Sequence, residues 1–252
     1  RTVTTGTSGC SKSRKPLVPV VTVRGGAWVV VAPTINEEMM HRAVVSLVNL
    51  AHYEPAAKRI KECVLNIQRD ASGEETAPVQ LAALLEMACS LAKRRETHPE
   101  AFHRGVIFSF WSGEELGLIG SDRFAAKPTV DLKQVVAYLN FDMVGRLREN
   151  KLTLQGVGSS SVWKKLIERR NVLAGFDLTL QQDPYLPTDT TSFYPKGIPV
   201  LAWFTGSHEE YHRPADDPDT LNYEGIERVT RFACNCLLYT SPSPRDQRGS
   251  RM

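Results

Sequence analysis

Three short segments of this 252-residue chain are apolar almost throughout, and they limit its fold more than any other feature. The letters VIFSFW, VVAYLNF and PVLAWF stand in the segments Gly105–Trp111, Gln134–Phe141 and Pro199–Phe204. A strand with one solvated face alternates apolar and polar residues, so continuous apolar runs of this length indicate strands that are buried on both faces. They therefore predict a mostly parallel sheet that is covered on both sides.

The rest of the chain supplies segments with helical and strand-like patterns in alternation, as in βαβ units. We predict a three-layer α/β sandwich in which a mostly parallel central sheet is flanked by helices. The further strands are expected at Ala27–Ala32, Ala43–Leu50, Lys151–Gln155 and Asp177–Gln181, and the helices at Gln80–Lys93, Ser121–Ala126, Ser161–Leu173 and Tyr223–Leu238.

Composition sets the expected limits of the domain. Residues 1–24 are rich in Ser, Thr, Lys and Pro and are expected to be a disordered or truncated lead-in. Residues 240–252 are polar and Pro-rich, unlike the helical pattern before them, and we expect them to be a non-native tail. Residues 25–239 are therefore expected to form one domain.

The charge balance and the length of the apolar runs argue against nucleic-acid binding and a membrane span. The net charge is only +3, from 31 Lys and Arg against 28 Asp and Glu, and no basic stripe of the kind that binds nucleic acid is visible. The longest apolar runs are far shorter than the roughly 20 residues that a membrane-spanning helix needs. We expect neither a nucleic-acid partner nor a membrane span.

Groups that can bind a metal follow each of the three apolar segments. Glu114 and Glu115 come after the first, Asp142 directly after the second, and His212 in the loop after the third. Open α/β sheets bind their ligands at the carboxyl ends of the strands. A cation there neutralises one carboxylate and leaves another free to act as a base. Carboxylate and imidazole together suit Zn²⁺.

Each of these residues also has an ordinary explanation when it is taken alone. Glu114 and Glu115 fit a solvated turn, Asp142 fits a helix N-cap, and His212 fits an exposed loop. Their coincidence at one edge of one predicted sheet favours a site.

Four segments in the right order also resemble a known family. Its Gly-Glu-Glu motif is matched by Gly113–Ser121, its Asn-x-Asp-Met motif by Asn140–Met143, and its Tyr-His-x-Pro-x-Asp motif by Tyr211–Asp216. The stretch that leads to the last of these motifs is matched by Thr191–Phe204. The family is that of the zinc aminopeptidases in metallopeptidase family 28. The resemblance covers about half of the chain, from Gly105 to Leu238. It implies a zinc exopeptidase fold, a peptide substrate and two zinc ions. A secreted or periplasmic location is an expectation from this resemblance alone.

The resemblance also implies a role for each matching residue. Glu114 is the expected general base, which takes a proton from the attacking water and passes it to the leaving amine. Glu115 and His212 are expected to bind one zinc ion and Asp142 the other, and Tyr211 to donate a hydrogen bond to the oxyanion.

Asp216 receives a hypothesis of its own. Its carboxylate would accept the second N–H group of His212 and thereby fix the tautomer of that imidazole. The alternative is an ordinary turn residue in the segment Pro-Ala-Asp-Asp-Pro.

The upstream half of the family's metal site is matched less well. The family has a histidine at a strand end and a later aspartate that bridges both metals. Ala51-His52-Tyr53-Glu54 resembles the first piece, and Asp70-Ala71-Ser72-Gly73 the second, but the alignment on Ala-Ser-Gly places Arg69 at the bridging position. His52 and Asp70 are the candidate ligands here. Two zinc ions repel each other without a shared carboxylate, so a single zinc ion is the alternative.

Three functions follow from these residues. The first is a zinc aminopeptidase. The second is a single-zinc acyl transferase similar to glutaminyl cyclase, and the third is a non-catalytic binding domain that resembles a peptidase. Residues Gln182–Thr191, Phe193 and Tyr194 are expected to line the substrate pocket.

Overall fold

The computed structural model describes residues 27–33, 56–58, 60–61, 78–102, 104–111, 113–211, 213 and 215–238 of the chain. The predicted strand Ala43–Leu50 and both predicted domain limits lie outside these residues.

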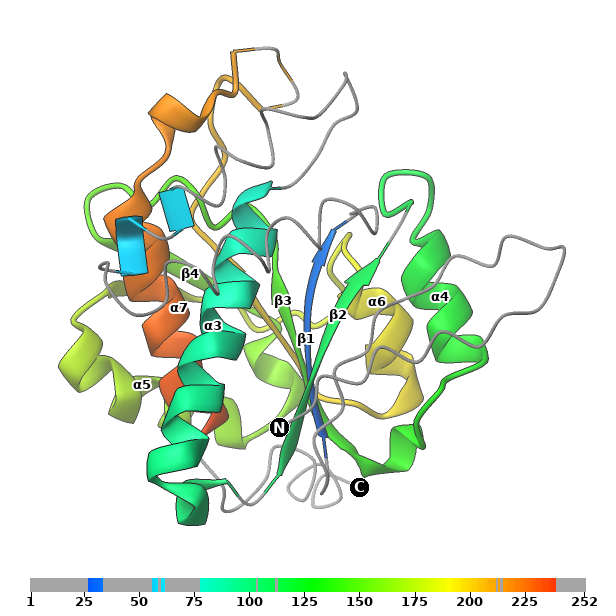
Figure 1. The fold of residues 1–252 in the computed structure, drawn as a ribbon. Coiled ribbons are helices and arrows are strands. Elements are labelled where there is room, and N and C mark those ends of the chain that lie inside the picture. Colours follow the sequence, from blue (N-terminus) through cyan, green and yellow to red (C-terminus); the bar gives the residue numbers. More distant parts are fainter. Residues whose placement is uncertain are drawn as a thin grey trace, which may run out of the picture.

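A six-stranded sheet of order β2-β1-β3-β6-β4-β5 forms the centre of the described structure (Figure 1). β1 pairs in parallel with β2 and with β3, and β3 pairs in parallel with β6. β4 is antiparallel to β6 and parallel to β5. The carboxyl ends of β1, β2, β3 and β6 therefore share one edge. The strands are β1 Ala27–Pro33, β2 Gly105–Trp111, β3 Val135–Phe141, β4 Lys151–Gln155, β5 Asp177–Leu180 and β6 Val200–Phe204.

Helices cover both faces of this sheet, with α3, α5 and α7 on one side and α4 and α6 on the other (Figure 1). The predicted three-layer sandwich with a mostly parallel sheet is thus confirmed. Among the described helices, none has both the length and the apolarity that crossing a bilayer requires. The helices are α3 Pro78–Thr97, α4 Ile119–Ala126, α5 Val162–Ala174, α6 Thr190–Phe193 and α7 Tyr223–Leu237, with 3-10 helices at Pro99–Ala101, Leu132–Gln134, Val157–Ser159, Tyr194–Lys196 and Pro218–Thr220.

The apolar strands are continuous because each serves two cores. In β2, Val106, Phe108 and Phe110 pack into the larger core with α3 and α7. Ile107 and Trp111 point to the opposite face and pack into the smaller core with α4 and α6. Successive side chains of a strand point to opposite faces, so a strand between two helix layers needs an apolar residue at nearly every position.

The element boundaries agree closely with the sequence prediction, except for α6. β2 and β4 have the predicted limits, and α3 extends the predicted helix Gln80–Lys93 at both ends. α6 was not predicted, since its sequence Thr-Thr-Ser-Phe contains poor helix formers. Phe193 at its end is fully buried, so tertiary packing rather than propensity stabilises this turn.

A buried serine replaces a missing stretch of strand beside β6. The last residue pair between β4 and β6 is Gln155 with Ala202. Beyond it, the Ser159 hydroxyl donates to the Val200 carbonyl at 2.7 Å and accepts the Val200 N–H at 3.0 Å. The indole N–H of Trp163 also donates to this hydroxyl, at 3.0 Å. One hydroxyl thus satisfies three buried polar groups of the sheet and α5.

Ser159→Ala should lower the free energy of unfolding by about 3 kcal/mol, because it leaves buried donors and an acceptor without partners. Ser109→Ala is the matched control. Ser109 is also a fully buried serine of the sheet, but its hydroxyl has no hydrogen-bond partner among the described residues. We expect it to change the free energy of unfolding by less than about 1 kcal/mol in urea denaturation. Equal losses in both variants would contradict the assigned role of Ser159.

Candidate active site

A tight turn after β2 presents Glu114 and Glu115. Gly113 has a φ of +66°, and its carbonyl accepts a hydrogen bond from the N–H of Ile119 at 3.1 Å. The Glu114 carbonyl accepts one from Leu118 at 2.9 Å. A Cβ at position 113 would lie 3.2 Å from the Ile119 side chain, and the positive φ disfavours any side chain, so the turn requires glycine there. The turn leaves Glu114 half-buried and Glu115 exposed.

Asp142 follows β3 directly and is half-buried. The next residue, Met143, has a φ of +52°, in the left-handed region that non-glycine residues rarely adopt. The Met143 carbonyl accepts hydrogen bonds from both the N–H and the hydroxyl of Thr205, at 3.1 and 2.6 Å. Backbone strain of this kind persists only where the surroundings hold it. The chain after β6 therefore fixes the backbone next to Asp142.

The buried phenol of Tyr138 shows that three carboxylates share one neighbourhood. Burial raises the pKa of Tyr138 well above its usual value, and the negative charges of Asp189, Glu114 and Asp142 raise it further. The hydrogen bond from the Trp111 indole, at 3.1 Å, acts in the opposite direction. Glu114 and Asp142, from strands that β1 separates, thus lie close enough to act on the same group.

Asp189 lies in the predicted pocket wall Gln182–Thr191, but the sequence analysis did not single it out as a site residue. It is only 2% exposed, and burial raises the pKa of its carboxyl to about 6; a hydrogen bond from Ser121 lowers it, and the charges of Asp142 and Asp122 raise it. One of its oxygens, Oδ1, has no hydrogen-bond partner among the described residues. Its only sequence signal is an acidic residue just before the stretch Thr191–Phe204 that matches the family.

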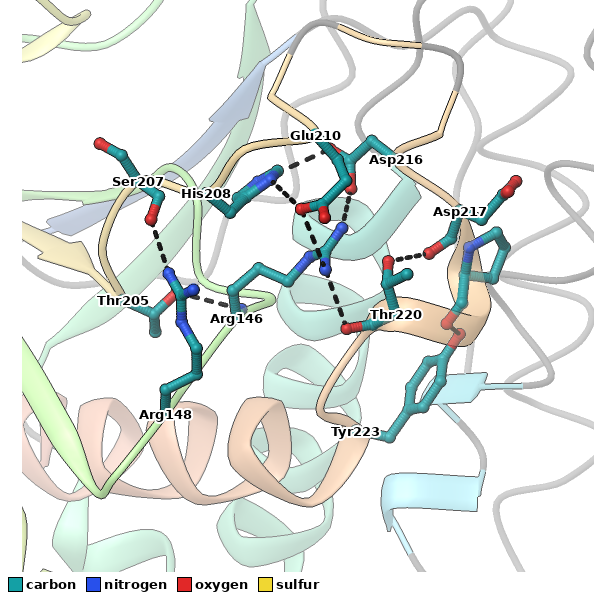
Figure 2. Close-up of polar contacts among 11 residues, drawn as sticks. Arg146, Arg148, Thr205, Ser207, His208, Glu210, Asp216, Asp217, Thr220 and Tyr223 are labelled. Carbon is teal, nitrogen blue, oxygen red and sulfur yellow. Dashed lines mark hydrogen bonds and ion pairs between the residues drawn. The ribbon is translucent and has the colours of Figure 1, made fainter.

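The loop after β6 contains Tyr211 and Asp216. Figure 2 shows Asp216 beside Arg146 and His208. Tyr211 is 45% exposed, and its ring stands edge-on to that of His208, with centroids 6.0 Å apart. Asp216 forms an ion pair with Arg146 and lies 3.6 Å from Nε2 of His208. These contacts do not test the predicted contact of Asp216 with His212, which stays a prediction.

Three of the predicted metal ligands, His212, His52 and Asp70, lie outside the described residues. The other two, Glu115 and Asp142, lie at the carboxyl edge of the sheet as predicted. Within the described part of the chain, no group of three His, Cys, Asp or Glu side chains could hold a metal ion. The predicted convergence on one metal site therefore stays a prediction.

Parts of the predicted pocket wall are buried, namely Leu186, Asp189 and Thr190 in one segment and Phe193 after it. Phe193 is fully buried in the smaller core, where its ring stacks on Tyr138 with centroids 4.2 Å apart. It therefore cannot line a solvent-accessible pocket. Tyr194 is half-buried and meets the exposed ring of Tyr185 edge-on at 5.0 Å.

The described carboxylates do not complete a metal site by themselves, but the chemistry of this edge suits a divalent cation. Glu114, Asp142 and Asp189 place negative charge around one buried phenol, and the pKa of Asp189 is raised partly because its acidic neighbours repel its charged form. A cation would relieve that repulsion. The oxygen-rich donor set, with an imidazole expected in the neighbouring loop, suits zinc.

Comparison with known proteins finds aminopeptidases among the chains of similar sequence. An aminopeptidase of Pseudomonas aeruginosa is 33% identical over 180 aligned positions, and the match covers 58% of this chain and 32% of that protein. The chain thus spans about a third of the length of this relative.

Two solved structures have a similar fold. The zinc aminopeptidase of Bacillus subtilis matches 90% of this chain and 52% of its own at a TM-score of 0.59 and 18% identity. The glutaminyl cyclase of Porphyromonas gingivalis matches 86% of this chain and 75% of its own at a TM-score of 0.58 and 14% identity. These likenesses support the fold alone.

The family assignment rests on the sequence itself. The model of peptidase family M28 matches residues 78–237, which are more than half of the chain and include the turn after β2, the segment after β3 and the loop after β6. The chain therefore belongs to peptidase family M28.

Proposed function

We propose that this protein is a zinc-dependent aminopeptidase that removes amino-terminal residues from peptides. One observation carries the proposal: the parallel pairing of β2, β1 and β3 places Glu114 and Asp142 at the same edge of the sheet, within the stretch that the M28 family model matches. The aminopeptidase relative supports the reaction class. A secreted or periplasmic location is part of the proposal and rests on the family resemblance.

Glu115 and His212 would hold one zinc ion and Asp142 the other, with His52 and Asp70 as the candidate ligands of the upstream half-site. When bound, zinc lowers the pKa of a water molecule and polarises the scissile carbonyl. Two ions are expected from the family.

The chain's own residues supply the remaining steps. Glu114, half-buried at the end of a fixed turn, takes a proton from the attacking water and delivers it to the leaving amine. Tyr211 is exposed enough to reach a substrate and donates a hydrogen bond to the developing oxyanion. Carboxylates at this edge also attract the α-ammonium group of the substrate, which favours exopeptidase action.

A glutaminyl-cyclase-like reaction with one zinc ion is the second candidate. The cyclase of P. gingivalis is matched over 75% of its length, against 52% for the Bacillus aminopeptidase. Glu54 and Arg69, which replace aspartates of the family pattern, also favour a single-metal site or a non-catalytic binding domain.

Substitution of each of the two adjacent glutamates should affect a different property of the enzyme. Glu114→Gln removes the base but keeps the shape of the side chain, so kcat should fall by about 10²–10⁴-fold while zinc affinity stays within about threefold of wild type. Glu115→Gln should weaken zinc binding by at least about tenfold, because it removes a ligand charge. Hydrolysis of an aminoacyl-anilide and competition with a chelating dye measure the two effects.

Glu209→Gln is the control for these two variants, because Glu209 is an exposed glutamate in the loop after β6 and has no assigned role. It should leave both kcat and zinc affinity unchanged. If Glu114→Gln retains full turnover, Glu114 is not the base.

Zinc content should decide between the candidate functions. Removal of metal by a chelator should abolish aminoacyl-anilide hydrolysis, and added zinc should restore it. We expect two zinc ions per chain by elemental analysis. One zinc ion per chain, together with cyclisation of a glutaminyl peptide, would instead establish the cyclase function. A protein that neither binds zinc nor turns over either substrate would be a non-catalytic binding domain.

A further inference from the structure

The segment that follows Asp142 contacts both ends of the loop that contains Tyr211. At the start of the loop, the N–H of Arg146 donates to the Thr205 hydroxyl at 3.1 Å. At its end, the N–H of Asn222 donates to the Gly145 carbonyl at 3.0 Å. Residues 143–147 and residues 205–222 therefore form one connected unit, although they are distant in the chain.

The guanidinium of Arg146 lies at the centre of this unit (Figure 2). Its side chain is only 12% exposed. Its two terminal nitrogens contact the later half of the loop: Nη2 pairs with Asp216, and Nη1 donates to the Thr220 carbonyl at 3.1 Å. Nη1 also lies 3.8 Å from the carboxylate of Glu210. The planar fork of arginine holds several acceptors in a fixed geometry, whereas lysine is a point charge on a flexible stem.

A histidine lies beside both Glu210 and Asp216, the two acidic residues that Arg146 contacts. The side chain of His208 is 7% exposed and lies 3.4 Å from Glu210 and 3.6 Å from Asp216. Both carboxylates thus face the same arginine and the same imidazole. Tyr211, whose ring meets His208 edge-on, follows directly after Glu210 in the chain.

We propose that Arg146 is a positioning residue, which fixes the loop bearing Tyr211 and His212 relative to the segment bearing Asp142. The inference rests on the proposed function, since it assigns those three residues to one site. Arg146 acts through the loop and does not touch substrate. Its contacts with residues 210, 216 and 220 on both sides of position 212 restrict the loop, so ligand groups from two strands keep one spacing.

The test compares Arg146→Ala with Arg228→Ala. Arg228 is a half-buried arginine of α7 that donates to Asn150 and to the Ala174 carbonyl, at 2.7 and 3.1 Å, and stacks on Phe176. It makes a similar set of contacts, but none of them is with the loop after β6. Loss of a half-buried arginine is therefore common to both variants, and loss of the loop contacts is specific to Arg146→Ala.

The first measurement uses metal-free protein. Amide hydrogen exchange of peptides within residues 207–217 should be at least about tenfold faster in Arg146→Ala than in wild type, because local opening no longer breaks the Arg146 contacts. The same peptides should exchange at the wild-type rate in Arg228→Ala. Unchanged exchange in Arg146→Ala, or an equal increase in both variants, would overturn the proposal.

The second measurement concerns the site. Arg146→Ala should weaken zinc binding by about 10–100-fold and lower kcat to a similar degree, with KM changed by less than about threefold, since it disturbs alignment rather than substrate contacts. If Arg146→Ala does not fold, Arg146→Lys carries the test and should show smaller shifts in the same direction, because it keeps the charge but loses the fork.

A double-mutant cycle separates this role from a direct action of Asp216 on His212. If the pair Arg146–Asp216 holds the loop, Asp216→Asn should add little to the effect of Arg146→Ala. Fully additive effects on zinc affinity would reject the pair as the positioning contact. A wild-type protein without zinc binding would reject the proposed function, whereas the exchange of the metal-free protein still decides whether Arg146 fixes the loop.

Discussion

Parallel pairing of β1 with β2 and β3, and of β3 with β6, is the constraint on which the rest of the structure depends. It brings three chain segments, after Trp111, Phe141 and Phe204, to one edge of the sheet. β4 pairs with β6 in the opposite direction, with Thr153 opposite Phe204, so β4 begins at that same edge. The connection from β3 to β4 therefore runs beside the loop after β6. The contacts of Arg146 are a consequence of this topology.

The same edge concentrates negative charge. Glu114, Asp142 and Asp189 all oppose ionisation of Tyr138, and burial and acidic neighbours raise the pKa of Asp189 to about 6. Like charges in a partly buried site destabilise the folded chain unless a cation or a proton compensates them. A divalent cation compensates several carboxylates at once, which is why this arrangement suits a metallopeptidase better than it suits a merely structural edge.

The sequence predicted the elements whose signal is local. Continuous apolar runs located β2, β3 and β6, and a residue that follows such a run, such as Glu114 or Asp142, could be assigned to the sheet edge without coordinates. Asp189 and Arg146 could not be found in this way. The partners of Arg146 in the loop lie 70 and 74 residues away in the chain, and nothing in the neighbouring sequence specifies them. α6 was missed for the same reason, since packing overrides its weak helix propensity.

Phe193 shows how the apolar core determines the charged edge. Its ring stacks on Tyr138 and lies 5.9 Å from the ring of Trp111, the last residue of β2. Asp189 immediately precedes the helical turn that ends at Phe193, so insertion of this ring into the core sets where the buried carboxylate lies. A smaller residue at position 193 would loosen both the aromatic cluster and Asp189. Packing in the smaller core and acidity at the sheet edge are therefore coupled through one turn of helix.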